Sequence, residues 1–160
     1  MPIILWIDPG STTVWYALIE KIGHNFKLID YGVIATTPKI PVAEKLFEIG
    51  TDIKHLIEKY SPSLIAIEKI FFTNNLKTGI DVAQCRGVVL YETIKASIAL
   101  IEYTPLQVKK AITGNGAANK KQLQNAIKMI LGLKEIPKPD DAADAIWLAY
   151  IGAIWIKNIK

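Results

Sequence analysis

Two acidic residues in this sequence follow apolar runs, at places where a carboxylate is expensive to bury. Asp8 ends the run Ile3–Ile7, and Glu68 ends a second apolar run, 64–67. A short apolar run closed by turn residues predicts a strand buried on both faces, so each acid would lie at the carboxyl end of an interior strand. Burying such a carboxylate costs several kcal/mol unless a cation or another partner compensates it. For Asp8, capping of the Pro-Gly turn that follows is the alternative.

Further acids open the last predicted helix, in the segment Asp140-Asp141-Ala142-Ala143-Asp144. Residues three apart share one helix face, so Asp141 and Asp144 would project together. Asp140 has an ordinary role as the N-cap, and Asp141 can favour the helix dipole. Asp144 lies inside an otherwise apolar stretch, where an unpaired acid is costly. The small residues around these acids would let the helix approach a sheet closely.

If Asp8, Glu68, Asp141 and Asp144 converge, their mutual repulsion calls for cations. Mg²⁺ prefers oxygen ligands. Two such ions about 3.5–4 Å apart can activate a water and stabilise the leaving oxygen of a phosphodiester. The chain has 19 basic and 15 acidic residues, so setting these four acids aside leaves 19 basic against 11 acidic residues. An acidic site in a basic surface is what a metal-dependent nuclease requires.

The basic residues are unevenly distributed along the chain. The stretch from Tyr103 to Lys134 contains no acid and six lysines, at positions 109, 110, 120, 121, 128 and 134. A block with one sign of charge is often only a solvated face, and a phosphate-binding surface is the functional alternative.

Length and composition set the class of protein. The 160 residues are 51% hydrophobic and 21% charged, which predicts a single folded domain over residues 1–160 and excludes a disordered chain. The single cysteine, Cys85, excludes an internal disulfide and a Cys-based zinc site, and a cytoplasmic location is expected. We expect neither a signal peptide nor a membrane-spanning segment.

The order of the expected elements predicts an α/β fold. Strand patterns cover residues 3–8, 12–20, 26–36, 64–68 and 97–103, and helical patterns cover residues 42–60, 76–96, 104–111, 119–131 and 140–156. Short turns between the first three strands predict an antiparallel meander, and the strands that alternate with helices add parallel neighbours. We therefore expect a five-stranded mixed sheet, three antiparallel and then parallel strands, flanked by helices.

Taken together and in order, several motifs resemble the RuvC family of Holliday junction resolvases. They are IDPGS at 7–11, AIEKIFF at 66–72, AQCRGV at 83–88, a lysine-rich G-x-G turn at 114–116 and DDAADA at 140–145. The match is collinear from about residue 3 to residue 150. The resemblance implies a ribonuclease H-like fold and an endodeoxyribonuclease with two Mg²⁺ per active site, Mn²⁺ being able to substitute. Its catalytic and metal-binding residues would be Asp8, Glu68, Asp141 and Asp144.

The same resemblance implies a set of DNA contacts. Phe71 matches an aromatic that stacks on unpaired bases at the junction centre, with an ordinary core Phe as the alternative. Lys109 and Lys120 match lysines that contact backbone phosphates, and Lys121 extends that basic stretch. Arg86, the only arginine, is either structural or phosphate-facing.

Partners are implied as well. Family members are homodimers whose symmetry matches a four-way DNA junction, and each subunit nicks one of two strands of like polarity. The helix expected at 76–96, with Val82, Val88, Val89 and Ile94, resembles the one that forms the dimer interface. The branch-migration proteins RuvA and RuvB are expected partners if a bacterial chromosome encodes the chain.

Two tryptophans depart from the family pattern. Trp6 and Trp15 stand where glycine is expected, beside the first strand and the turn after it. A large ring at Trp15 would pack against the last helix or narrow the site. Other functions remain open: a nuclease with the same carboxylates that acts on RNA–DNA hybrids or other branched DNA, and a junction-binding protein that has lost cleavage. An actin-like ATPase, suggested by IDPGST, would need two lobes, which 160 residues cannot supply.

Overall fold

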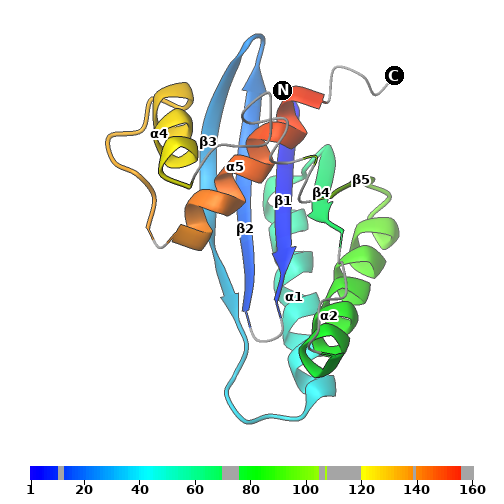
Figure 1. Cartoon of the computed structure of the whole chain (residues 1–160). Coiled ribbons are helices and arrows are strands. Elements are labelled where there is room, and N and C mark those ends of the chain that lie inside the picture. Colours follow the sequence, from blue (N-terminus) through cyan, green and yellow to red (C-terminus); the bar gives the residue numbers. More distant parts are fainter. Residues whose placement is uncertain (11–12, 70–75, 105–106, 108–119, 139, 156–160) are drawn as a thin grey trace.

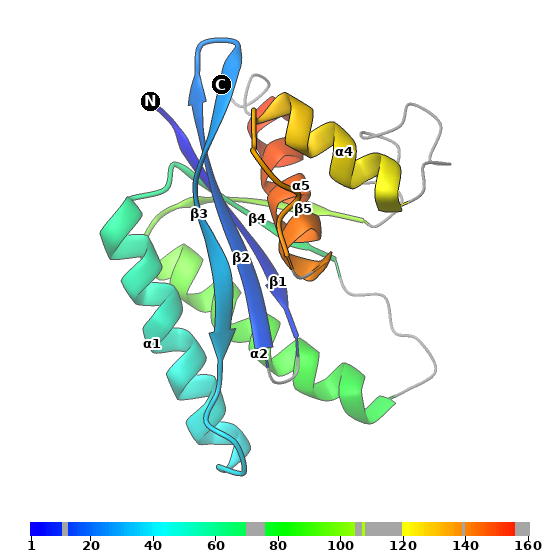
Figure 2. The same ribbon diagram turned by 90° about the vertical axis from the view of Figure 1, so that its left-hand side faces the viewer.

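The computed structural model describes residues 1–10, 13–69, 76–104, 107, 120–138 and 140–155. Its strands are β1 (Ile3–Pro9), β2 (Thr13–Ile22), β3 (Asn25–Ala35), β4 (Leu64–Glu68) and β5 (Ala99–Tyr103). Its helices are α1 (Val42–Tyr60), α2 (Leu76–Lys95), α4 (Lys120–Ile130) and α5 (Asp140–Trp155). The strands form one sheet in the order β3-β2-β1-β4-β5. Helices α1 and α2 cover one face, α5 covers the other, and α4 lies beside α5 (Figures 1 and 2).

This is the mixed sheet that the sequence predicts. The pairs β3–β2 and β2–β1 are antiparallel, whereas β1–β4 and β4–β5 are parallel. The β2–β3 turn is tighter than predicted, because Gly23 takes a left-handed conformation (φ 62°) and closes the hairpin between Ile22 and Asn25. Thr104 makes the hydrogen bonds expected of an N-cap: the Gln107 N–H donates to Thr104 Oγ1 (3.1 Å), and the Thr104 N–H donates to Gln107 Oε1 (2.8 Å). Apart from Thr104 and Gln107, the helix predicted at 104–111 lies outside the described residues.

Alternation along β1 divides the core into two layers. Ile4 and Trp6 belong to the layer under α5, whereas Leu5 and Ile7 belong to the layer under α1 and α2. All four side chains are fully buried, as expected for an interior strand with helices on both sides. The even-numbered residues of β1 therefore face α5, and Asp8 continues that series.

Helix α5 packs close to the sheet because small residues line its inner side. Ala142, Ala143 and Ala145 are buried, which confirms the expected close approach. A Cβ added at Gly152 would lie 3.1 Å from Cγ2 of Ile4 and 3.3 Å from Cβ of Ala66. The helix runs opposite to β1, so its N-terminus lies toward the end of the sheet at which β1 and β4 finish (Figures 1 and 2).

On the other face, hydrogen bonds fasten α1 to the edge strand β3. The Tyr60 hydroxyl donates to Oδ2 of Asp30 (2.5 Å), and the Tyr16 hydroxyl reaches the same oxygen at 3.5 Å. Burial, and then the Asp30 carboxylate, raise the pKa of Tyr16. None of the helices within the described residues is long and apolar enough to cross a membrane.

We expect Gly152→Val to lower the free energy of unfolding by about 1–3 kcal/mol, the usual cost of overpacking a core. Valine has a better helix propensity than glycine, so a loss of stability would come from overpacking against Ile4 and Ala66 and not from helix propensity. Urea denaturation would measure it, with Ile154→Ala at an exposed position of the same helix turn as the control. Equal stability of Gly152→Val and wild type would contradict this close contact.

Candidate active site

The two predicted strand-end acids are neighbours across the β1–β4 pair. The parallel register joins Ile4 to Leu64 and continues to Ile7 opposite Ile67. The next residue on β1 is Asp8 and the next on β4 is Glu68. Since neighbouring strands lie about 4.8 Å apart, the two backbones hold these carboxylates side by side. Both side chains are half-buried, and alternation places both on the α5 face.

Aromatic residues flank this pair of carboxylates on both sides. Trp15 of β2 pairs with Asp8, and Tyr103 of β5 pairs with Glu68. Both rings pack against the core layer under α5, so they share a face with the acids. A row therefore crosses the sheet in the order Tyr103, Glu68, Asp8, Trp15. Sequence reasoning missed Tyr103, although it ends an apolar strand just as Glu68 does.

The two tryptophans have different places in this site. Trp6 is fully buried beneath it and stacks on Tyr103, with ring centroids 6.0 Å apart. The strand between these two residues is β4, on which Ala66 pairs with Trp6. The small side chain of Ala66 leaves room for the Trp6 and Tyr103 rings to meet above β4. Trp15 is half-buried beside Asp8 and packs against the core under α5. Trp6 therefore forms the floor of the site and Trp15 one of its walls.

Cys85 of α2 belongs to the core layer on the other face of β1, and the charge of Asp8 affects the pKa of its thiol. Burial first, and then the Asp8 carboxylate, raise the pKa of the Cys85 thiol to about 12. The thiol stays protonated at neutral pH, and this argues against a nucleophilic role. Burial likewise raises the pKa of Tyr103 to about 12.

The other predicted acids lie in the first turns of α5. The backbone of Asp141 and Asp144 is helical, and their side chains lie outside what the structure describes. The described side chains contain no group of three or more metal-ligating residues, and Asp141 and Asp144 are not among these side chains. Asp8 and Glu68 supply the hard oxygen donors that Mg²⁺-type ions select, so these two residues fit such an ion.

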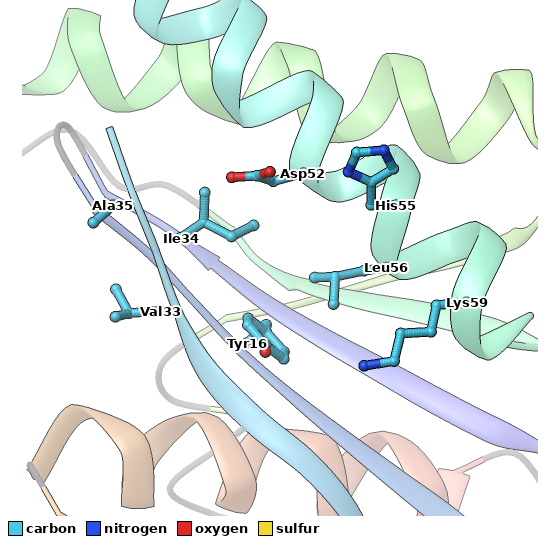
Figure 3. A pocket seen from close by; sticks show the side chains of 8 residues that line it. All are labelled: Tyr16, Val33, Ile34, Ala35, Asp52, His55, Leu56 and Lys59. Atoms are coloured by element: carbon cyan, nitrogen blue, oxygen red, sulfur yellow. The ribbon is translucent and has the colours of Figure 1, made fainter. Parts of the chain in front are cut away.

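A separate hollow of about 470 Å³ opens on the opposite face, between β3 and α1. Figure 3 shows Tyr16 and Leu56 at its base, with Asp52, His55 and Lys59 around it. Tyr16 belongs to the core layer under α1 and α2, whereas its neighbour Trp15 belongs to the layer under α5. The sheet therefore separates this hollow from Asp8 and Glu68.

Comparison with known proteins shows the family of this chain. Residues 4–151 match the family model described as crossover junction endodeoxyribonuclease RuvC. The chain belongs to the RuvC family. A RuvC from Halothermothrix orenii is 50% identical over 144 residues, which cover 90% of this chain and 87% of that one. The RuvC from Petrotoga mobilis is 45% identical over 158 residues, covering 99% and 97%.

Solved structures match over nearly the whole chain. The structure of T. thermophilus RuvC in complex with Holliday junction substrate superposes with a TM-score of 0.87 at 26% identity, covering 99% of this chain and 97% of that one. The yeast mitochondrial Holliday junction resolvase Ydc2 shares the fold at 15% identity, with a TM-score of 0.66 and coverage of 95% and 79%. The predicted ribonuclease H-like fold is thereby confirmed.

The predicted DNA-contacting residues of this RuvC-family chain are only partly within the described structure. Phe71 and Lys109 lie outside the described residues, and so does the side chain of Lys120. Lys121 is exposed on α4. Arg86 of α2 forms an ion pair with Glu102 of β5, and the two side chains are 22% and 31% exposed. This pair gives Arg86 a structural role, and a phosphate contact by it stays a prediction.

Two of the four residues predicted for the dimer helix, Val88 and Val89, need correction. Val89 is buried in the chain's own core, and Val88 packs against Gly50 of α1, so these valines face inward. The valine pattern alone did not reveal that a second helix covers this side of α2. Ile94, the fourth predicted residue, is exposed, and Ile80 and Tyr91 are the other large apolar side chains exposed among those described on α2, at 64%, 56% and 63% exposure respectively.

We expect Arg86→Gln to lower the free energy of unfolding by about 1–2 kcal/mol, because it breaks a mostly buried ion pair with Glu102. Glu102→Gln is the matched change, and the double variant should lose less than the sum of the two. Junction binding should keep its salt dependence. A salt slope that falls by about 1 in Arg86→Gln alone would instead identify a phosphate contact.

Proposed function

We propose that this protein is a Holliday junction resolvase, an endodeoxyribonuclease that nicks four-way DNA junctions. The observation that carries the proposal is the pair of carboxylates Asp8 and Glu68, held side by side on the face that α5 covers, in a chain of the RuvC family. A related chain of the same fold, from T. thermophilus, is known in complex with a Holliday junction substrate. Paired, symmetric nicks in strands of like polarity are the expected reaction.

Nucleases of this family depend on divalent metal ions. We infer Mg²⁺, two ions per site, with Mn²⁺ as a substitute, held by Asp8 and Glu68 together with Asp141 and Asp144. When bound, such ions activate the attacking water and stabilise the leaving oxygen of the phosphodiester. The chain would hold the carboxylates of Asp8 and Glu68 on neighbouring strands, with Trp15 beside Asp8. The expected products carry 5′-phosphate and 3′-hydroxyl ends.

The substrate would be held mainly through its phosphates. Lys109, Lys120 and Lys121 are the proposed backbone contacts, and Phe71 is the proposed stacking residue at the junction centre. Contacts of this kind make affinity fall steeply with salt. A single domain, a cytoplasmic location and, for a chromosomal gene, RuvA and RuvB as partners complete the proposal.

A homodimer is part of the same proposal, and the outer face of α2 supports it. Ile80, Gln84, Gly87, Tyr91 and Ile94 are all exposed, and they recur at alternating spacings of four and three. This spacing forms one stripe along a helix, as in helix pairs that pack along their length. A Cβ added at Gly87 would meet nothing within 4 Å, so the middle of the stripe is open to a second helix. Two such stripes related by a two-fold axis would give a symmetric interface.

We expect Asp8→Asn to abolish cutting of a four-way junction in Mg²⁺ while junction affinity stays within about tenfold, because the lysines that bind phosphates are unchanged. Asp52→Asn, at an exposed acid of α1 on the other face of the sheet, should cut like wild type. Gel analysis of 5′-labelled junctions measures cutting, and fluorescence anisotropy measures affinity. Full activity in Asp8→Asn would contradict the proposed role of this carboxylate.

We expect Gly87→Arg to convert the dimer to a monomer, since an arginine in the middle of the stripe blocks close approach of a second α2. Arginine favours helix more than glycine does, so the fold should be retained. Light scattering coupled to gel filtration measures the mass. Met129→Arg on α4, another exposed apolar position, is the control and should stay dimeric. A dimer that survives Gly87→Arg would place the interface elsewhere.

A further inference from the structure

A second feature of the α5 face lies at the edge of the sheet, apart from the carboxylates. Leu28 and Tyr31 of β3 and the segment 133–138, which joins α4 to α5, surround a hollow of about 360 Å³. The segment lies alongside β3 at the left of the sheet in Figure 1. Pro137 is buried, whereas Lys134 and Lys138 are exposed beside the hollow. We call this feature the β3 groove.

A β-bulge creates the floor of the β3 groove. Leu18 pairs with Asp30 but the next residue, Ile19, pairs with Leu28, so Ile29 is the extra residue of β3. Ile19 and Ala17 face α5, and their partners on β3 are Leu28 and Tyr31. Without the bulge, residues three apart on a strand would point to opposite faces. The bulge therefore brings an aliphatic and an aromatic side chain together on the α5 face, a way in which bulges often re-aim side chains near functional sites.

The β3 groove lies on the same face of the sheet as the carboxylate row, and the strand pairings give the separation between them. Asp8 pairs with Trp15, and Trp15 pairs with Val33 of β3. Tyr31 lies two residues along β3 from Val33, on the same face. With strands about 4.8 Å apart and a rise of about 3.4 Å per residue, the backbone at Tyr31 lies about 12 Å from that at Asp8. One DNA strand advances about 3.4 Å per nucleotide along the helix axis, so this span corresponds to about three or four nucleotides.

The charge beside the β3 groove suits a polyanion. Between residues 120 and 138 the sequence has lysines at 120, 121, 128, 134 and 138, and Glu135 is the one acid. An open hollow with an apolar and aromatic floor and exposed lysines beside it matches the needs of a nucleic-acid strand, which presents phosphates on one side and sugars or bases on the other.

We propose that the β3 groove binds the backbone of one junction arm three to four nucleotides from the cut, with Lys134 and Lys138 on phosphates and Tyr31 against a sugar or base. This inference rests on the proposed function. It extends the DNA-binding surface beyond the predicted lysines, across β2 and β3 to the edge of the sheet. The arm would pass Trp15 on its way from Asp8 to the β3 groove.

The test compares Lys134→Gln/Lys138→Gln with a matched double variant on the opposite face, Lys54→Gln/Lys59→Gln of α1. Fluorescence anisotropy with a labelled four-way junction in EDTA gives Kd between 50 and 200 mM salt. Each phosphate contact contributes about 0.9 to the slope of log affinity against log salt. The salt slope of the groove variant should be smaller than that of wild type by about 1.8. Between 50 and 200 mM salt its affinity should therefore fall by a factor about 12-fold smaller than the factor for wild type. The α1 variant should keep the wild-type slope.

A second arm locates the contact on the DNA. For wild type, junctions with neutral methylphosphonates three to four nucleotides from the cut should bind more weakly than the unmodified junction. For the groove variant, the same modified junctions should bind no more weakly than the unmodified junction. A groove variant with the wild-type salt slope, or an α1 variant whose slope falls by the same amount, would overturn the proposal for the β3 groove. If wild type still cuts the junction in Mg²⁺, the proposed resolvase function stands. Wild-type protein that neither binds nor cuts the junction would overturn both.

Discussion

The parallel pairing of β1 with β4 is the constraint on which the rest of this structure depends. Its register makes Asp8 and Glu68 neighbours at the carboxyl ends of two interior strands. Two adjacent carboxylates repel each other, and partial burial strengthens that repulsion because the surroundings are less polar than water. Rigid strands prevent the acids from moving apart, so bound cations are the natural compensation. The same rigidity would fix the metal ligands relative to the phosphodiester.

Close packing of α5 follows from that constraint. The helix carries the other two predicted acids, and its buried alanines and Gly152 let it lie directly on β1 and β4. Large rings fill the space that these small residues leave around the site. Trp6 stacks on Tyr103 above Ala66, and Trp15 stands beside Asp8. Small and large side chains are thus matched across the layer, and departures from glycine at 6 and 15 are accommodated by packing rather than by a change of fold.

Much of this was predictable because it rests on local patterns. Apolar runs ending in acids give β1 and β4, and helical spacing gives the limits of α1. Features that depend on long-range contacts were not predictable. The ion pair of Arg86 with Glu102 joins two elements, and the inward direction of Val88 and Val89 depends on how α1 and the sheet cover α2. The bulge at Ile29 has no clear signal in the sequence, yet it determines which side chains of β3 face α5.

The proposed function requires that the metal-bound carboxylates of this chain promote the cutting of four-way junctions. The most direct measurement is a gel assay with a 5′-labelled four-way junction, a matched duplex and an RNA–DNA hybrid, each with Mg²⁺ or with EDTA. We expect paired, symmetric nicks in the junction alone, and only with Mg²⁺. Cutting of the hybrid but not of the junction, or cutting that persists in EDTA, would contradict it.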